Sequence, residues 1–429
     1  MSSISEKVEL ACSHVDEQET FALLREMVNI PSPSGEEHRL AEFLARYMSA
    51  NGLDASVQEV RGTQSNAIAF TGKASQQPTL MYYSPIDTAF RGDREEDEPW
   101  IDLRSRPDLV PRAIVDGDVM VGLGAHNPKG HAACAIMAAI GLARARLLKS
   151  SNVCVALGGG GMPTTSFGAH GPVPAIGHGT GCKHLLASGV VPRNVVVSKP
   201  STVSFEEVGV AWFRVAVEGV LGYAGTRHRM KHRNPIVDAA QVVQELEAWF
   251  PEYTKANTSG AVAPQGSIGA IRGGWPNKPT FIPGVCEIYL DLRVSPRVTV
   301  SSVEEQFGDA IAAIRARNPG IRISWEMLHG DPGTHTDPES DVIAAAIKAW
   351  DFATGTNYVP EEQGSGATEA GVFRQAGIPT VKIGMPPPPE KLPHSGQFSM
   401  GEVHRQSMVR LTRALMYVAL FLDSHQKRT

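Results

Sequence analysis

The sequence lacks several features that would assign the chain to a specialised class of protein. Its five cysteines are scattered, odd in number and without a Cys-x-x-Cys spacing, which argues against a disulfide framework or a structural zinc site. It has no run of about 18 apolar residues, so no transmembrane helix is expected. The N-terminal segment is polar and acidic, without the apolar core of a signal peptide. These absences predict a cytoplasmic protein.

An excess of charge of either sign is missing as well. The 40 Lys and Arg residues against 45 Asp and Glu residues give a net charge of −5, which predicts binding neither to nucleic acid nor to a membrane. The basic segment 225–233 is short and typical of a solvated or substrate-facing loop. Neither a phosphate-binding GxxxxGK[ST] pattern nor a GxSxG nucleophile pattern occurs. A chain of 429 residues is, however, long enough for two domains.

Short apolar runs alternate with helical patterns along most of the chain. Strands are expected at residues 66–70, 79–84, 152–159, 194–198 and 379–384, and helices within 18–52 and at 131–148, 340–354 and 402–424. The helical pattern within 18–52 is interrupted at "PSPSGEE" and ends at Gly52, which is suited to a C-terminal cap. This alternation predicts a mixed-sheet α/β/α domain.

The pattern of expected helices and strands changes between residues 204 and 329. The patterns there follow the order β-α-β-β-α-β, which is typical of a ferredoxin-like α+β unit. The α/β pattern resumes afterwards. We therefore predict a discontinuous α/β catalytic-type domain, residues 1–203 plus 330–429, with a lid or dimerisation domain inserted at 204–329.

Five motifs occur in order along nearly the whole chain: "LLREMVNIPSPSGEE", "MYYSPIDTAF", "GLGAHNPKGH", "GGWPNKPTFIPGVCEIYLDLRVSP" and "GATEAGVFRQAGIPTVKIG". Together they resemble the dizinc aminoacylase/carboxypeptidase family, which includes acetylornithine deacetylase and succinyl-diaminopimelate desuccinylase. The resemblance implies an amidohydrolase with two zinc ions bridged by an Asp and a water. It also implies a lid domain that forms a homodimer and sends groups to the partner's site.

The positions that align with the family's zinc ligands carry other residues. These are Pro85 for the first His, Asn127 for the bridging Asp, Gly158–Gly161 with Met162 for the acidic pair, Lys199 for the later carboxylate and Phe398 for the last His. Zinc requires imidazole, thiolate or carboxylate donors. The sequence therefore predicts that the dizinc site is absent and that no cofactor is bound. A relocated single-metal site drawn from Asp87, His126, His131 and His394 remains the alternative.

The remaining polar residues suggest a neutral to positive pocket suited to a carboxylate. Asp87 and His126 are candidates to activate water, and Asn127, Lys129 or Lys199 to stabilise an oxyanion. Asp87 is expected to pair with His126, Lys199 or Asn127. The alternatives for Lys199 are a base or nucleophile and an ion pair with Asp87 or Glu369, and those for Cys182 are a helix-start thiolate and an inert buried thiol. Glu369 is expected to order the site, and the substrate-binding candidates are Arg293, Asn277, Tyr223 (aligned with the lid His), His394 and Ser395.

The resulting hypothesis is a metal-independent hydrolase on a dizinc amidohydrolase scaffold. It would cleave an amide or related C–N bond of a small, carboxylate-bearing substrate, with water activated by side chains. Two alternatives remain open from the sequence. One is a non-catalytic small-molecule-binding protein that kept the fold, and the other is a metal-free isomerase or lyase that uses proton transfer.

Overall fold

The computed structural model describes residues 3–164, 167–168, 171–172, 177–393 and 399–425. The chain divides into two compact units. Unit 1 comprises residues 1–205, 336–361 and 368–429, and unit 2 comprises 206–335 and 362–367. Unit 2 extends past the predicted end at 329 because β11 (Glu206–Glu207) pairs with β18 (Thr334–His335) and closes the insertion.

Unit 1 is built on a seven-stranded sheet. Its strands, in the order β1-β2-β6-β3-β9-β19-β10, are Asp54–Arg61, Gln64–Phe70, Val153–Gly158, Leu80–Pro85, Val195–Ser198, Thr380–Ile383 and Val203–Ser204. The four neighbours β6, β3, β9 and β19 are parallel, whereas β1, β2 and β10 pair antiparallel. The predicted mixed sheet is confirmed, and its central strands are the apolar runs of the sequence.

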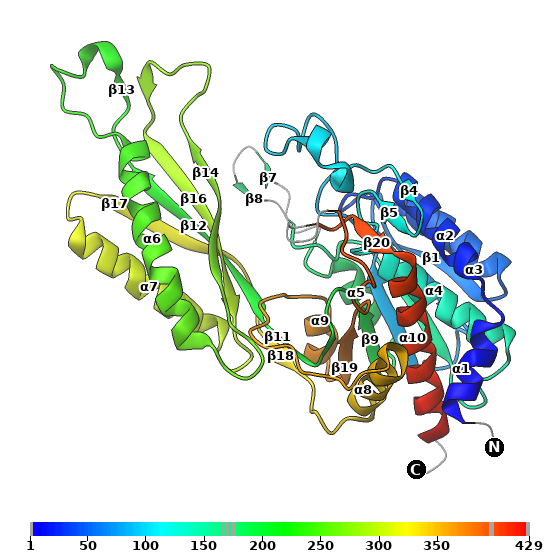
Figure 1. The fold of residues 1–429 in the computed structure, drawn as a ribbon. Coiled ribbons are helices and arrows are strands. Elements are labelled where there is room, and N and C mark those ends of the chain that lie inside the picture. Colours follow the sequence, from blue (N-terminus) through cyan, green and yellow to red (C-terminus); the bar gives the residue numbers. More distant parts are fainter. Residues whose placement is uncertain (1–2, 165–166, 169–170, 173–176, 394–398, 426–429) are drawn as a thin grey trace. The chain divides into compact units, whose positions relative to one another are not determined.

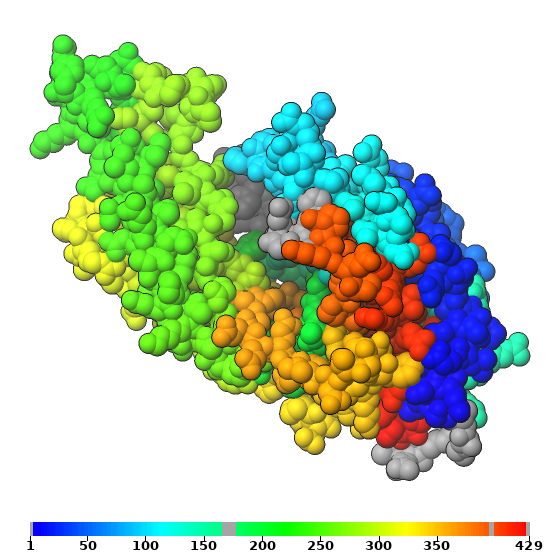
Figure 2. Space-filling view, in the orientation of Figure 1, coloured from blue at the N-terminus to red at the C-terminus, as the bar shows by residue number. Residues whose placement is uncertain are grey.

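Helices cover both faces of this sheet (Figure 1). One face packs against α3 (His38–Ala50), α4 (Lys129–Arg144) and α8 (Asp341–Thr354), with α1 (Ile4–Cys12), α2 (Glu17–Asn29) and α10 (Arg405–His425) beyond them. The other face carries α5 (Thr180–Ala187) and α9 (Ala370–Gln375). Tyr82 and Tyr83 are both fully buried, on opposite faces, because side chains alternate along a strand. Figure 2 shows α1 and α10 side by side at the surface.

Local sequence explains several element ends. Helix α3 ends at Ala50 with Asn51 as its C-cap, and Gly52 follows with φ +85°, which confirms the expected glycine cap. The alanine-rich α4 is buried on nearly all sides, because small side chains let it pack closely between the sheet and α10. Residues 402–404 form a strand, β20 (Glu402–His404), where the sequence predicted the start of the last helix. Pairing with β5 (Val119–Val121), which also pairs with β4 (Ile114–Asp116), holds these residues extended.

The remaining short elements of unit 1 are η1 (Leu103–Ser105), η2 (Pro107–Leu109), β7 (Phe167–Gly168) and β8 (Gly171–Pro172). Among the described residues, none of the helices combines the length and the apolar character that crossing a membrane requires.

Unit 2 is a four-stranded antiparallel sheet with two helices. Its main elements are β12 (Gly209–Glu218), α6 (Pro235–Asn257), β14 (Gly266–Gly273), β16 (Val285–Val294), α7 (Val300–Arg317) and β17 (Arg322–Asp331). The strand order β14-β16-β12-β17 and the burial of both helices in one core confirm the ferredoxin-like prediction. A two-stranded extension, β13 (Gly222–Tyr223) with β15 (Phe281–Ile282), lies at one end, followed by η3 (Ala224–Thr226).

Candidate functional site

The site lies where the four parallel strands of unit 1 end. The carboxyl ends of parallel strands meet at one edge of a sheet, which is where ligands bind in open α/β folds. This edge carries the segments 85–88 after β3, 158–162 after β6, 199–202 after β9 and 384–388 after β19. Two of the predicted site residues, Asp87 and Lys199, therefore lie at this edge.

Asp87 is fully buried and holds the loop that follows β6. Its carboxylate accepts hydrogen bonds from the N–H groups of Gly161 (2.8 Å) and Met162 (2.9 Å) and from the Ser34 hydroxyl. The predicted pairing with His126, Lys199 or Asn127 is wrong within the described structure. The reason is that backbone N–H groups from the glycine loop already satisfy both carboxylate oxygens.

Glu37 is a second buried carboxyl group at this edge, and the sequence reasoning missed it. One of its oxygens accepts from the N–H groups of Gly35 (2.7 Å) and Gly160 (2.9 Å), and the other has no hydrogen-bond partner. Burial, together with the charge of Asp87, raises the pKa of Glu37 to about 8. Glu37 therefore keeps its proton at neutral pH. It stands in the "SGEE" turn, which we used only as a family signature.

The glycine loop leaves no empty space for the family's acidic pair. A Cβ on Gly158 would overlap the Tyr83 hydroxyl, and a Cβ on Gly161 would overlap Glu369 and Pro85. Neighbouring side chains fill the space beside these glycines, so glycine is required by close packing at both positions.

Lys199 and Glu369 form a buried ion pair, with Nζ and Oε2 2.9 Å apart. The two side chains are 6% and 1% exposed, so the pair is almost completely removed from water. Burial raises the pKa of Glu369, and the ammonium of Lys199 opposes that rise. This is the ion pair that we weighed against a nucleophilic Lys199. Because the charges of Lys199 and Glu369 offset each other and Glu37 keeps its proton, the neutral to positive pocket stays a prediction.

Lys129 is fully buried at the start of α4. Its Nζ donates to the carbonyl oxygens of Met27 (3.0 Å) and Ile30 (2.8 Å), at the C-terminal end of α2. The carbonyl oxygens at the C-terminal end of a helix carry partial negative charge and attract a cation. Burial lowers the pKa of Lys129 to about 7. These contacts are structural, and a role in stabilising an oxyanion stays a prediction.

Two histidines lie in contact where the loop before α4 meets the end of β19. The Nδ1 atom of His131 lies 2.7 Å from the His126 carbonyl oxygen, and the Met385 N–H donates to its Nε2 atom (3.3 Å). Both bonds fit a neutral imidazole with the proton on Nδ1, and burial lowers the pKa of His131. With both nitrogens engaged, His131 is not free to bind a metal ion.

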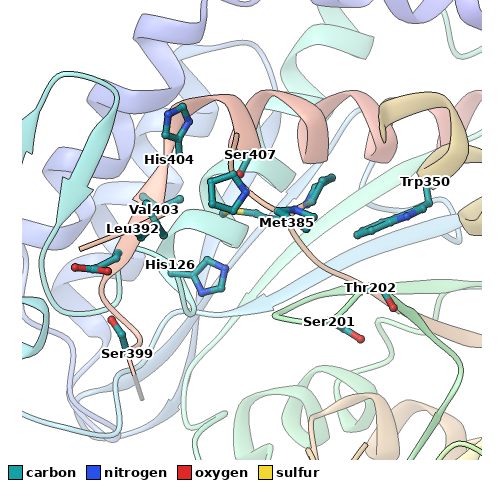
Figure 3. Close-up of a pocket in the computed structure, with 14 residues that line it drawn as sticks. His126, Ser201, Thr202, Trp350, Met385, Leu392, Ser399, Val403, His404 and Ser407 are labelled. Atoms are coloured by element: carbon teal, nitrogen blue, oxygen red, sulfur yellow. The ribbon is translucent and has the colours of Figure 1, made fainter. Parts of the chain in front are cut away.

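His126 is half-buried and packs edge-on against His131, with ring centroids 5.0 Å apart. Burial lowers its pKa to about 4. Among the described residues, no hydrogen bond to its ring is recorded. Figure 3 shows the ring lining a pocket of about 370 Å³. His126 is therefore neutral at physiological pH and open to a ligand.

The pocket beside His126 is formed by segments far apart in the sequence. Its lining residues are His126, Ser201, Thr202, Trp350, Met385, Pro386, Pro387, Pro388, Leu392, Ser399, Glu402, Val403, His404 and Ser407. The Thr202 and Ser407 hydroxyl oxygens are buried without a hydrogen-bond partner, and so is Oδ1 of nearby Asn127. Of these residues, the sequence reasoning found only His126 and Asn127. The others could not be selected from the sequence because they match no motif.

The lid residues predicted to bind substrate do not cluster within unit 2. Tyr223 is exposed, with its ring 5.8 Å from that of Phe281, and Asn277 is exposed in the loop before β15. Arg293 lies near the other end of β16, with Nε 3.1 Å from Oδ1 of Asp291. A ten-residue strand spans about 30 Å, so the two groups are at opposite ends. His394, Ser395 and Phe398 lie outside the described residues.

Cys182 is buried in the first turn of α5, and its Sγ donates to the Gly179 carbonyl at 3.1 Å. Burial raises the pKa of the thiol, which favours the inert alternative over a reactive thiolate. All five cysteines are free thiols.

Comparisons with known proteins agree with this architecture. Residues 205–319 match the peptidase dimerisation domain. A probable carboxypeptidase of Emericella nidulans is 28% identical over 135 residues, a match that covers 30% of this chain and only 28% of the carboxypeptidase. Human carnosine dipeptidase 1 superposes with a TM-score of 0.70 at 17% identity, over 99% of each chain. An M20 family metallo-carboxypeptidase from Sulfolobus solfataricus gives a TM-score of 0.66 at 15% identity, over 95% of this chain and 99% of that one.

Proposed function

This chain carries the peptidase dimerisation domain and has the fold of the M20 peptidases, and from that premise we propose that it is a metal-independent amide hydrolase. Its substrate would be a small molecule that bears a carboxylate, cleaved at an amide or related C–N bond. The relatives are described as a carboxypeptidase, a dipeptidase and a metallo-carboxypeptidase. The proposed amide bond therefore agrees with the names of these relatives. The proposed absence of a metal ion departs from the metallo-carboxypeptidase.

The observation that carries the metal-free part is the buried pair of Lys199 and Glu369. Zinc at this edge would need carboxylates and imidazoles with free oxygen or nitrogen atoms. Here the Asp87 oxygens accept backbone N–H groups, both His131 nitrogens are bonded, and Glu369 holds an ammonium. This donor set does not fit two zinc ions. Elsewhere, His329 and Asp331 lie 2.8 Å apart in unit 2, so the test must detect a metal at any position.

His126 is the residue to which we assign water activation. In this mechanism, the neutral imidazole takes a proton from water as its oxygen attacks the substrate carbonyl carbon. The same proton then passes to the departing nitrogen as the C–N bond breaks. Asn127 follows His126, and its amide is suited to stabilise the oxyanion. Asp87 and Lys129 would support the site by holding the glycine loop and α2 in place.

We further propose that the protein works as a homodimer formed through unit 2. The match to a dimerisation domain suggests this assembly. Large apolar side chains are exposed within the matched region, namely Val220, Leu221, Tyr223, Met230, Ile236, Val237, Ile271, Trp275, Phe281 and Val285. Exposed apolar surface of this extent on a domain is typical of a protein interface. A reducing, cytoplasmic location is part of the proposal, since the five thiols are unpaired.

A non-catalytic binding protein is the rival function, and one observation favours it. Asp87, Lys129 and His131, which the family resemblance places at the site, are all engaged in internal hydrogen bonds. A protein that binds its ligand without chemistry would need only the open pocket and the half-buried ring of His126 that lines it. Turnover therefore decides between the two functions.

The test is metal analysis of the purified protein together with a hydrolysis screen. The screen uses N-acyl and N-carbamoyl amino acids and dipeptides, with and without a strong chelator. We expect less than one tightly bound zinc ion per chain and turnover that the chelator does not change. Two zinc ions per chain with chelator-sensitive turnover would overturn the metal-free proposal. Binding of these compounds without hydrolysis would support the rival.

A further inference from the structure

The pocket beside His126 differs in chemistry from the edge of the sheet next to it. Trp350, Met385, Pro386–Pro388, Leu392 and Val403 make most of its wall apolar. Among the described lining residues, none is a lysine or arginine, and Glu402 contributes a carboxyl group. Among these described residues, a substrate carboxylate would find no lysine or arginine to pair with. The pocket therefore suits an uncharged group.

Two hydroxyl groups provide hydrogen-bonding atoms in this mainly apolar pocket. Ser407 is only 3% exposed, and its Oγ has no hydrogen-bond partner. The Oγ1 of Thr202 is buried without a partner as well. Leaving a buried hydroxyl unpaired is unfavourable, because the group loses its hydrogen bonds to water without replacement. Both hydroxyls lie in one pocket, so a molecule bound there has two hydrogen-bonding groups within this pocket to contact.

The two hydroxyls come from segments that lie far apart in the sequence. Ser407 belongs to the first turn of α10, and Thr202 to the loop between β9 and β10. Figure 3 shows the Met385 side chain between them in this view, with the His126 ring on the same pocket. Both hydroxyls and the His126 ring therefore line the same pocket.

We propose that this pocket binds the uncharged, mainly apolar half of an amide substrate. The group would be an aromatic or branched aliphatic acyl or side-chain group, with Thr202 and Ser407 hydrogen-bonding its amide. This inference rests on the proposed amide hydrolysis for the reacting bond, but the binding itself does not. A volume of about 370 Å³ is within the usual range for small-molecule pockets. The substrate carboxylate would lie outside this pocket.

Calorimetric titration tests the proposal with two defined probes. N-acetyl-L-phenylalaninamide is uncharged and aromatic, whereas N-acetyl-L-aspartate places a second carboxylate on the side chain. We expect the aromatic probe to bind and the aspartate probe to bind at least tenfold more weakly. Equal binding of both probes, or no binding of the aromatic probe at millimolar concentration, would overturn the proposal.

Matched variants locate the binding. In S407A and T202V we expect the dissociation constant of the aromatic probe to rise about tenfold for each, because each loses one hydrogen bond to the ligand. T412V is the control, since Thr412 is buried in the same helix but does not line the pocket. Removing an unpartnered hydroxyl should not unfold the protein, and thermal melting of each variant verifies this. Wild-type affinity in both S407A and T202V contradicts the pocket assignment.

Failure of this inference is distinguishable from failure of the proposed function. Tight binding of the aromatic probe without hydrolysis of any amide contradicts the function and supports the pocket. Hydrolysis of substrates with charged side chains, at a rate that S407A leaves unchanged, contradicts the pocket and supports the function.

Discussion

Two neighbouring regions of unit 1 differ in whether their polar groups have partners within the protein. At the edge of the sheet, Asp87, Lys199 and Lys129 each have partners within the protein. In the pocket beside it, the hydroxyls of Thr202 and Ser407 have none, and the His126 ring has none recorded among the described residues. The first region has the character of a folded core, and the second has the character of a binding site. Sequence motifs pointed to the first region, whereas the capacity to bind a ligand is greater in the second.

Replacing Lys199 is the test with the largest expected effect on the region at the edge of the sheet. In K199M, Glu369 stays buried without its cation, and we expect the free energy of unfolding to fall by about 3–5 kcal/mol. Urea denaturation at pH 7 measures the change. The double variant K199M/E369Q should recover part of the loss, because the uncompensated charge is gone. K73M, which alters an exposed lysine, serves as the control. A K199M protein as stable as K73M would contradict the assignment of this edge as a structural core.

Glu37 provides a test through pH. Its folded pKa of about 8 lies above its unfolded value of 4.5, so between these values the folded state holds a proton that the unfolded state has lost. The contribution of Glu37 to stability is therefore present below pH 4.5 and is lost as pH rises towards 8. Between pH 5 and pH 8 the free energy of unfolding of the wild type should fall because of Glu37. We expect that fall to be roughly 2–4 kcal/mol smaller in E37Q.

Urea denaturation at the two pH values provides that measurement. E26Q is the control, because Glu26 is exposed on α2. If the free energies of unfolding of E37Q and E26Q change with pH in the same way as that of the wild type, Glu37 is not the buried acid described above.

His126 tests the pocket side of the comparison. In H126N, kcat/KM should fall about 100-fold for a substrate found in the screen, because the proton acceptor is lost. In the wild type, kcat/KM should rise as pH increases through about 4 and stay level between pH 6 and 8, since His126 must be neutral to act. H184N alters a histidine outside the pocket and should keep full activity. Unchanged turnover in H126N, or an inflection near pH 7 that this variant abolishes, would show that the assigned role or environment of His126 is wrong.

The smallest expected effect concerns the glycine loop. A Cβ in G161A would overlap Glu369 and Pro85, so we expect a loss of roughly 1–3 kcal/mol in the free energy of unfolding. G269A is the matched control, because nothing lies within 4 Å of the added Cβ there. Equal stability of the two variants would mean that the space around Gly161 is not filled as described.

The sequence predicted the architecture because fold-level signals are local and repetitive. Apolar runs defined β3, β6, β9 and β19, and the order of patterns between residues 204 and 329 defined the ferredoxin-like unit. It did not predict the partners of Asp87, because two of the three are main-chain N–H groups 74 and 75 residues away, which carry no residue-type signal.

The pocket was missed for a related reason. Thr202 and Ser407 are 205 positions apart in the sequence, and they meet only because β9 and β20 place their segments at the same pocket. The alignment with family motifs also directed attention to ligand positions. Glu37 stood in one of those motifs, yet its burial beside Asp87 depends on the path of the glycine loop.

The two hydrogen bonds of His131 give this molecule a built-in reporter. One joins its ring to the His126 carbonyl, and the other joins it to the Met385 N–H on the pocket wall. A ligand that moves the main chain at Met385 outward would lengthen its hydrogen bond to Nε2 of His131, and the nitrogen-15 resonance of that atom would then shift. Occupancy of the pocket could thus be followed by spectroscopy at a residue that itself lies outside the pocket wall, before any substrate has been identified.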